Sequence, residues 1–216
     1  MTEETISDLA RLRALAEEGR RMPLLGGRHM ILWGGAIMTA ALLHWGVVTR
    51  TLPWPMMSLA FIWFGLTGAA GLLSGSRFVL RAQHRENHDL GNRVERVIWQ
   101  FGGAFLGIVA TSIFLAAMIV QHQTGSTGRF LLFTLMPPIS FGVYAIALHA
   151  TAEVAAQHAL KPYALASLFF VAMTVMLAGS HWQMPATALG IFIVAILPGR
   201  LMLAGERAHE QASGNG

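Results

Sequence analysis

The chain contains no cysteine, which excludes disulfide bonds, thiolate metal sites and cysteine nucleophiles. Charge is also scarce: only 12% of the 216 residues are Asp, Glu, Lys or Arg, whereas soluble globular domains carry about 25%. The HExxH sequence of zinc proteases, phosphate-binding glycine loops and the cysteine pairs of zinc deaminases are absent as well. These absences disfavour a soluble enzyme, and we expect the protein not to be an enzyme.

Hydrophobic residues make up 54% of the chain and gather in six apolar segments. Each is close to the ~20 residues that a helix needs to cross ~30 Å of hydrocarbon. The sequence therefore predicts an all-α integral membrane protein whose six transmembrane helices form three outward-facing helical hairpins. The predicted spans are 28–48, 54–75, 97–120, 130–151, 162–181 and 185–204.

The basic residues predict how these spans are oriented. Of the 15 Lys and Arg residues, only Arg50 and Arg129 lie on one predicted side of the membrane. The positive-inside rule places the larger set in the cytoplasm. We therefore expect a multi-pass protein of a bacterial-type inner (plasma) membrane with both termini in the cytoplasm. Its predicted parts are a cytoplasmic amphipathic helix and linker (1–27), the bundle (28–205, with a charged cytoplasmic loop at 76–96) and a cytoplasmic tail (206–216).

Two cytoplasmic segments carry most of the charge. In the first, apolar residues such as Ile6, Leu9 and Leu12 recur at helical spacing, which indicates one apolar helix face. The second is the basic stretch from Arg77 to Arg96. Each segment is compatible with contact to lipid phosphates at the membrane surface, and the alternative is docking of a cytoplasmic protein. The candidate residues for contact with a partner or with lipid are Arg81, Arg85, His84, His88, Arg93 and Arg96.

Glycine and proline predict how the helices pack and bend. Two GxxxG pairs, Gly71 with Gly75 and Gly103 with Gly107, place glycines on one helix face, where helix backbones can approach closely. Such faces serve packing within the bundle or in a homo-oligomer. Pro137 and Pro138 lie inside the fourth predicted span and Pro198 inside the sixth, where each proline removes a backbone donor and should kink its helix.

Histidines are the remaining side chains that could bind a metal ion or a cofactor. His44, His122 and His181 are all predicted at the outer end of the bundle, where they could converge on Zn²⁺, on Cu, or on a haem as axial ligands. The competing interpretation is that each imidazole sits at the membrane interface with its polar tip in water. No cofactor is expected on that interpretation. On the other side, His84 and His88 have the i,i+4 spacing of metal ligands on one helix face.

Asp, Glu, Lys and Arg are almost missing from the predicted spans: Arg28 and Arg200 lie near the inner ends of the first and sixth, and Glu153 lies at the inner edge of the fourth. Because coupled transporters generally mark their pathway with such residues, a coupled carrier is disfavoured. The leading hypothesis is a non-enzymatic inner-membrane protein that engages a protein partner through its cytoplasmic helix and basic loop, as a sensor, regulator or accessory subunit. The alternatives are a haem- or metal-binding redox protein using the outer histidines, and a small-solute channel or permease. The expected partners are the lipid bilayer, a cytoplasmic protein and a second copy of the chain, with no direct contact to nucleic acid.

Overall fold

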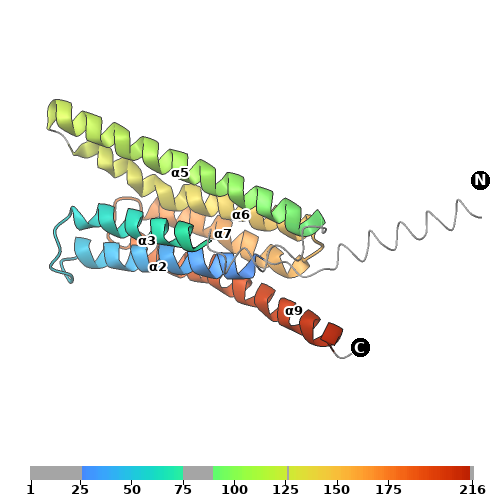
Figure 1. Ribbon diagram of the computed structural model, residues 1–216. Coiled ribbons are helices and arrows are strands. Elements are labelled where there is room, and N and C mark those ends of the chain that lie inside the picture. Colours follow the sequence, from blue (N-terminus) through green and yellow to red (C-terminus); the bar gives the residue numbers. More distant parts are fainter. Residues whose placement is uncertain (1–25, 75–89, 126, 215–216) are drawn as a thin grey trace, which may run out of the picture.

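The computed structural model describes residues 26–74, 90–125 and 127–214, and every regular element among them is helical. The predicted amphipathic helix within 1–27 and most of the basic loop therefore lie outside the described residues. Figure 1 shows the elements in chain order. They are α2 (Gly27–Val48), α3 (Ser58–Ser74), α5 (Leu90–Thr124), the 3-10 helix η1 (Gly128–Leu135), α6 (Met136–Val154), the 3-10 helix η2 (His158–Leu160), α7 (Lys161–Met176), α8 (Gln183–Ile191), the π-helix η3 (Phe192–Ile196) and α9 (Leu197–Gly214).

The predicted all-α class is confirmed for the described residues, and five helices are long and apolar enough to cross a membrane. Four of the six predicted spans correspond to single long segments that begin with α2, α5, η1 and η2. The sixth corresponds to the continuous run of α8, η3 and α9. The second span is represented by α3, which has 17 described residues and is shorter than the other five.

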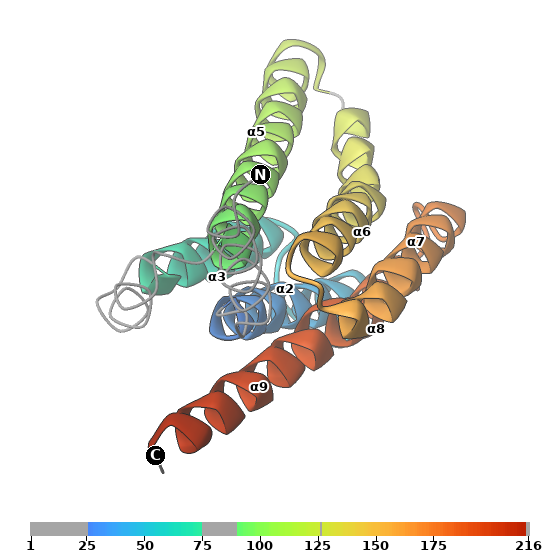
Figure 2. The ribbon, with the colours of Figure 1, turned by 90° about the vertical axis from the view of Figure 1, so that its right-hand side faces the viewer.

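The helices form two groups, which are linked by the contact between α7 and α8. On one side, α2 packs against α3, α8 and α9; on the other, α6 lies between α5 and α7. Figure 2 shows α3 and α5 at the periphery of this arrangement, whereas α2, α6 and α8 are nearer its centre. α5 is the least enclosed of the long helices, with 6% of its most apolar window buried.

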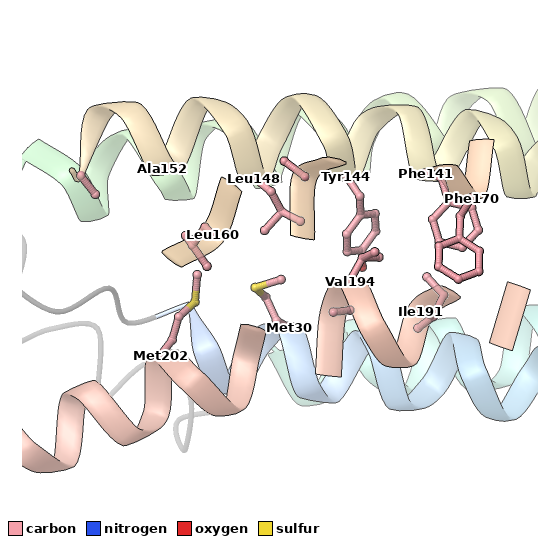
Figure 3. Packing of buried hydrophobic residues seen from close by; sticks show 13 residues of the cluster. Met30, Phe141, Tyr144, Leu148, Ala152, Leu160, Phe170, Ile191, Val194 and Met202 are labelled. Carbon is pink, nitrogen blue, oxygen red and sulfur yellow. The ribbon is translucent and has the colours of Figure 1, made fainter. Parts of the chain in front are cut away.

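The main core lies where α6, α7 and α8 meet α2 and α9 (Figure 3). Phe141 and Phe170 stack with ring centroids 5.3 Å apart and Ile191 lies beside them, while Leu148 belongs to the same cluster two turns further along α6. A smaller cluster around Val47 and Ile62 joins α2 to α3. In lipid the hydrophobic drive between helices is largely removed, so close van der Waals packing of this kind stabilises the bundle.

The outward faces of the helices are strongly apolar. Leu72 on α3 and Phe101 on α5 expose 81% and 76% of their surface, and Ile108 follows two turns later on α5. Monomeric soluble proteins rarely leave such large apolar areas in water. The exterior is therefore consistent with contact with a lipid bilayer.

Close helix contacts occur at glycines other than the GxxxG pairs. A Cβ added at Gly27 would lie 2.7 Å from the carbonyl oxygen of Gly199, so the backbones of α2 and α9 are in direct contact. By contrast, a Cβ added at Gly103 or Gly107 would meet nothing within 4 Å, and one at Gly71 would just reach Trp33 at 4.0 Å. The fourth of these glycines, Gly75, lies outside the described residues. Within the single chain, the tight crossing is therefore between α2 and α9.

Pro137 and Pro138 mark the change from η1 to α6. The carbonyl of Thr134 would accept from residue 138 in an α-helix and from residue 137 in a 3-10 helix, and both are prolines without an N–H. The side chain of Gln183 replaces the missing donor, because its Nε2 lies 2.6 Å from the Thr134 oxygen. At these prolines the regular α-helix is thus interrupted, and a side chain from α8 supplies the missing hydrogen bond.

The same Gln183 amide also satisfies the end of α7. The next two backbone N–H groups after this helix, those of Leu177 and Ala178, donate to Met173 and Val175. This leaves the carbonyl of Thr174 without a backbone donor, and Gln183 Nε2 donates to it at 2.9 Å. Near the other predicted kink, the π-helix η3 ends two residues before Pro198, where a widened turn accommodates the missing N–H.

Candidate functional site

The structure describes only part of the predicted basic contact surface. Four of its residues lie outside the described residues: Arg81, His84, Arg85 and His88. Arg93 is placed on the first turns of α5, and Arg96 is half-buried on the same helix. The basic stretch is therefore continuous, at its end, with the helix that includes the third apolar segment.

α5 is longer than a membrane crossing requires. Its 35 residues correspond to about 52 Å, compared with ~30 Å of hydrocarbon. α9 lies at the same end of the bundle as the start of α5 and projects beyond the neighbouring helices (Figure 1). The starts of α2 and α5 and part of α9 are at one end of the bundle. We call this region the Glu95 end.

A buried carboxylate lies at the centre of this end. Glu95 exposes 3% of its surface, and its carboxylate lies so close to Gly26 that a Cβ added there would collide with it. Gly26 is the N-cap of α2, where the helix dipole favours a negative charge. Glu206 on α9 and Arg96 on α5 are near enough for their charges to act on Glu95. Glu95 thus joins the start of α5 to the start of α2.

The prediction of the spans missed Glu95, because the third span was expected to begin at residue 97. The helical periodicity of the sequence nevertheless indicated that Glu95 belongs to the enclosed face of this helix. The residues at 95, 99, 102, 106 and 109 follow the alternating three- and four-residue spacing of one helix face, and all of them are buried or half-buried in the structure. Extending that stripe backward by one turn would have placed Glu95 on the enclosed face.

The three histidines that were predicted at the outer end of the bundle occupy separate environments. His44 on α2 accepts a hydrogen bond from Trp63 Nε1 on α3 at 3.0 Å, with the two rings arranged edge to face. His122, near the end of α5, is exposed. His181 is also exposed and lies beside Trp182, with centroids 5.2 Å apart. In the part of the chain that the structure describes, no group of three or more His, Cys, Asp or Glu residues could hold a metal ion.

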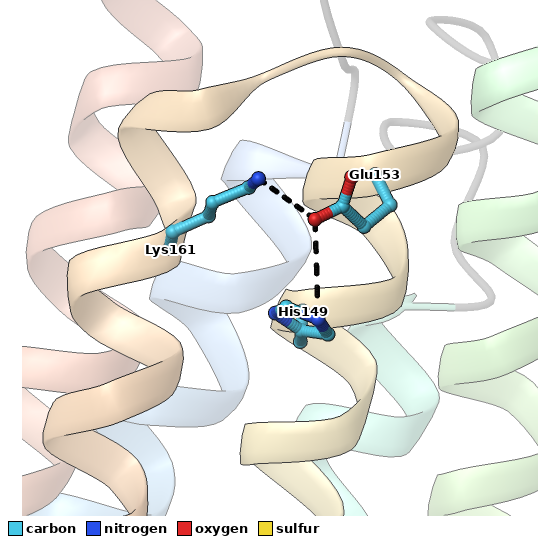
Figure 4. Close-up of polar contacts among 3 residues, drawn as sticks. All are labelled: His149, Glu153 and Lys161. Carbon is cyan, nitrogen blue, oxygen red and sulfur yellow. Dashed lines mark ion pairs between the residues drawn. The ribbon is translucent and has the colours of Figure 1, made fainter.

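Glu153, the carboxylate noted at the inner edge of the fourth predicted span, is at the end of α6 and is half exposed. Its Oε1 lies 2.7 Å from Lys161 Nζ at the start of α7 and 3.9 Å from His149 Nε2 (Figure 4). An exposed ion pair of this kind contributes little to stability, because solvent screens both charges. Its position makes it a link across the turn between α6 and α7.

The described residues define an all-helical protein of the multi-pass membrane type, with several apolar helices around a small packed core. No protein-family model, curated protein or solved structure is significantly similar to the chain. Its class therefore follows from its own residues and geometry.

Proposed function

We propose that the protein is a non-enzymatic, multi-pass protein of a bacterial-type inner membrane that engages a protein partner at its cytoplasmic side, as a sensor, regulator or accessory subunit. The observation that carries this proposal is the extension of α5 past the length of a membrane crossing. The extension carries Arg93 and Arg96 and follows directly on the basic loop. A partner bound to that loop would act on a long helix that runs along the edge of the bundle and packs on α6.

The proposal uses a topology of six spans with both termini in the cytoplasm. Support comes from the antiparallel neighbours: α2 packs on α3, α5 on α6, and α7 on α8. Each pair is what a helical hairpin through the bilayer requires. The charge asymmetry, with Arg50 and Arg129 alone on the outer side, supports the orientation.

The polar side chains of the central bundle support a role outside transport and catalysis. Ser167 donates to the Phe141 carbonyl at 2.8 Å, and Thr174 and Thr187 each donate to the carbonyl four residues earlier. Gln183 is engaged by its two carbonyl partners. Groups that close backbone hydrogen bonds are committed to structure, whereas a pathway for solutes needs polar groups that are free to bind them.

The proposed contact surface is Arg81, His84, Arg85, His88, Arg93 and Arg96. It is tested by purifying the full chain from cross-linked native membranes in detergent and comparing wild type with the double variant Arg81→Glu, Arg85→Glu. Because reversing charges at a complementary interface introduces repulsion as well as removing attraction, we expect partner recovery to fall by roughly tenfold.

The matched control is Arg129→Glu, which reverses a charge on the proposed outer side and should leave recovery at the wild-type level. Equal membrane abundance of all variants excludes misfolding as the cause. If the double variant recovers the same partners in the same amounts as wild type, the basic loop is not the contact surface.

A further inference from the structure

The start of α2 receives a carboxylate from another helix. Glu95 of α5 is 3% exposed, and the backbone N–H of Gly26 donates to its carboxylate. α2 itself has no acidic residue in its first turn and no capping side chain at Gly26. The first N–H groups of a helix have no partner within it, and the helix dipole favours a negative charge there. Glu95 therefore supplies what the sequence of α2 lacks.

α9 brings a second carboxylate to the same end of the bundle. A Cβ added at Gly27 would lie 3.0 Å from the Cβ of Met202, so this part of α9 packs on the start of α2. Glu206 follows four residues after Met202 and is on the same face of α9. Its Oε1 exposes less than 1 Å² of surface, and its charge acts on Glu95. Two carboxylates from different helices thus lie near the first turn of α2.

Few other described charges bear on Glu95. Arg96, the next residue on α5, favours the ionised carboxylate, as the N–H of Gly26 does. On α2, Arg28 is exposed and the ring of His29 lies beside Trp33. The remaining charged or titratable side chains described on α9 and on the facing ends of α6 and α7 are exposed or paired with one another: Arg200, Arg207, His149, Glu153 and Lys161.

Glu95 lies before the third predicted span, on the part of α5 that exceeds the length of a crossing. Burial, and after it the charge of Glu206, raises the pKa of Glu95 to about 7, although the Gly26 N–H and Arg96 act in the opposite direction. A protonated Glu95 can remain against Gly26 without a charge. An ionised one holds its charge away from water and beside a second carboxylate.

We propose that Glu95, beside Glu206, is a proton-sensitive contact: in its protonated form it holds the starts of α5 and α2 together, and its ionisation loosens the Glu95 end. The proposed partner surface is not required for this behaviour. The contact joins two helices whose starts are far apart in the sequence, so its loss would change how α5 is seated on the rest of the bundle.

The direction of the pH effect follows from the two pKa values of Glu95. The pKa is about 4.5 in an unfolded chain and about 7 in the folded protein, so the folded state holds the proton to higher pH. The stabilisation is therefore complete below about pH 4.5 and is lost as the pH rises through about 7.

Thermal unfolding of the full chain in detergent, followed by circular dichroism from about pH 5.5 to about pH 8.5, tests the proposal. Glu95→Gln places a neutral carboxamide at this position at every pH. We expect the melting temperature of wild type to fall by several degrees relative to that of Glu95→Gln as the pH rises. A constant difference between the two proteins would overturn the proposal, and so would a difference that grows in favour of wild type.

Hydrogen–deuterium exchange locates the effect, because the intrinsic exchange rate cancels when two proteins are compared at the same pH. At the alkaline end of the range, the amides at the start of α5 should exchange several-fold faster in wild type than in Glu95→Gln, and at the acid end alike. Equal exchange at both ends would overturn the proposal.

Glu153→Gln is the matched control, since this carboxylate is half exposed and pairs with Lys161. It should keep the pH profile of wild type, and a profile as flat as that of Glu95→Gln would contradict a specific role of Glu95. If Glu95→Gln does not fold, Glu206→Gln decides instead. Removing the second carboxylate should move the loss of stability to higher pH, and an unchanged profile would overturn the proposal.

Discussion

At the scale of single residues, a few polar side chains allow the backbone to depart from regular α-helix, because they donate hydrogen bonds to carbonyls that have no backbone donor. Gln183 is the clearest case, because one amide serves two carbonyls that no backbone donor reaches. One carbonyl is orphaned by Pro137 and Pro138, and the other by the end of α7. Without the amide, the buried carbonyl of Thr174 and the partly buried carbonyl of Thr134 would both be unsatisfied, which is costly in an apolar bundle.

Replacing Gln183 by leucine is expected to destabilise the folded protein. Two orphaned carbonyls at about 1–3 kcal/mol each give a loss of roughly 2–6 kcal/mol in the free energy of unfolding. Thermal or SDS-induced unfolding in detergent, followed by circular dichroism, measures the change.

The same substitution at Gln100 is the control, since that residue is exposed on α5, and it should leave stability nearly unchanged. If both variants unfold alike, the Gln183 bonds do not stabilise the fold.

At the scale of elements, the spacing of helices depends on which glycines face another backbone. Gly27 touches Gly199, and Gly34 faces Ala195 and Ile196, so α2 is held closely against the segment that contains η3 and α9. The GxxxG pair of α5, Gly103 and Gly107, faces outward instead. A pattern of small residues therefore identifies a surface that permits close approach, but not whether the chain itself uses it.

Gly27→Ala should weaken the contact between α2 and α9. The added Cβ would lie 2.7 Å from a backbone oxygen that no side-chain rotation can move. Separating the helices is expected to cost about 1–3 kcal/mol, as other forms of overpacking do.

Gly35→Ala on the same helix is the matched control, because its Cβ would meet nothing within 4 Å. It should be neutral or stabilising by up to about 1 kcal/mol, through the higher helix propensity of alanine. Equal melting temperatures for the two alanine variants would contradict the close crossing.

At the scale of the whole molecule, an even or odd number of spans decides whether the two termini lie on the same side of the membrane or on opposite sides. Among the described residues, five helices have spanning length, and α3, with 17 described residues, is shorter. If α3 also crosses, the two termini lie on the same side; if it does not, they lie on opposite sides. The proposed contact between the cytoplasmic segments and a partner requires the first arrangement.

Single cysteines test this directly, because the chain has none of its own. In intact cells, a membrane-impermeant maleimide should label Thr127→Cys, whereas Ser7→Cys and Ala208→Cys should be labelled only after permeabilisation. Labelling of Ala208→Cys alone among the terminal positions, before permeabilisation, would indicate five spans. Labelling of both terminal positions in intact cells would reverse the proposed orientation.

The sequence by itself determined the class of fold and the approximate position of each apolar helix. Length and hydrophobicity are local properties, and a run of about 20 apolar residues has few alternatives to a helix in lipid. The positions of Pro137, Pro138 and Pro198 were equally informative, since a missing N–H has the same local effect in any context.

Only the tertiary structure decided which residues of those helices face one another. The burial of Glu95 against Gly26, the donation from Gln183 to Thr134 and the contact of Gly27 with Gly199 each join residues far apart in the chain. Helical periodicity defines the faces of one helix but does not say which neighbour each face meets, because that choice depends on the packing of all the helices together. For the same reason, the sequence could not reveal that the histidines His44, His122 and His181 would lie in separate environments.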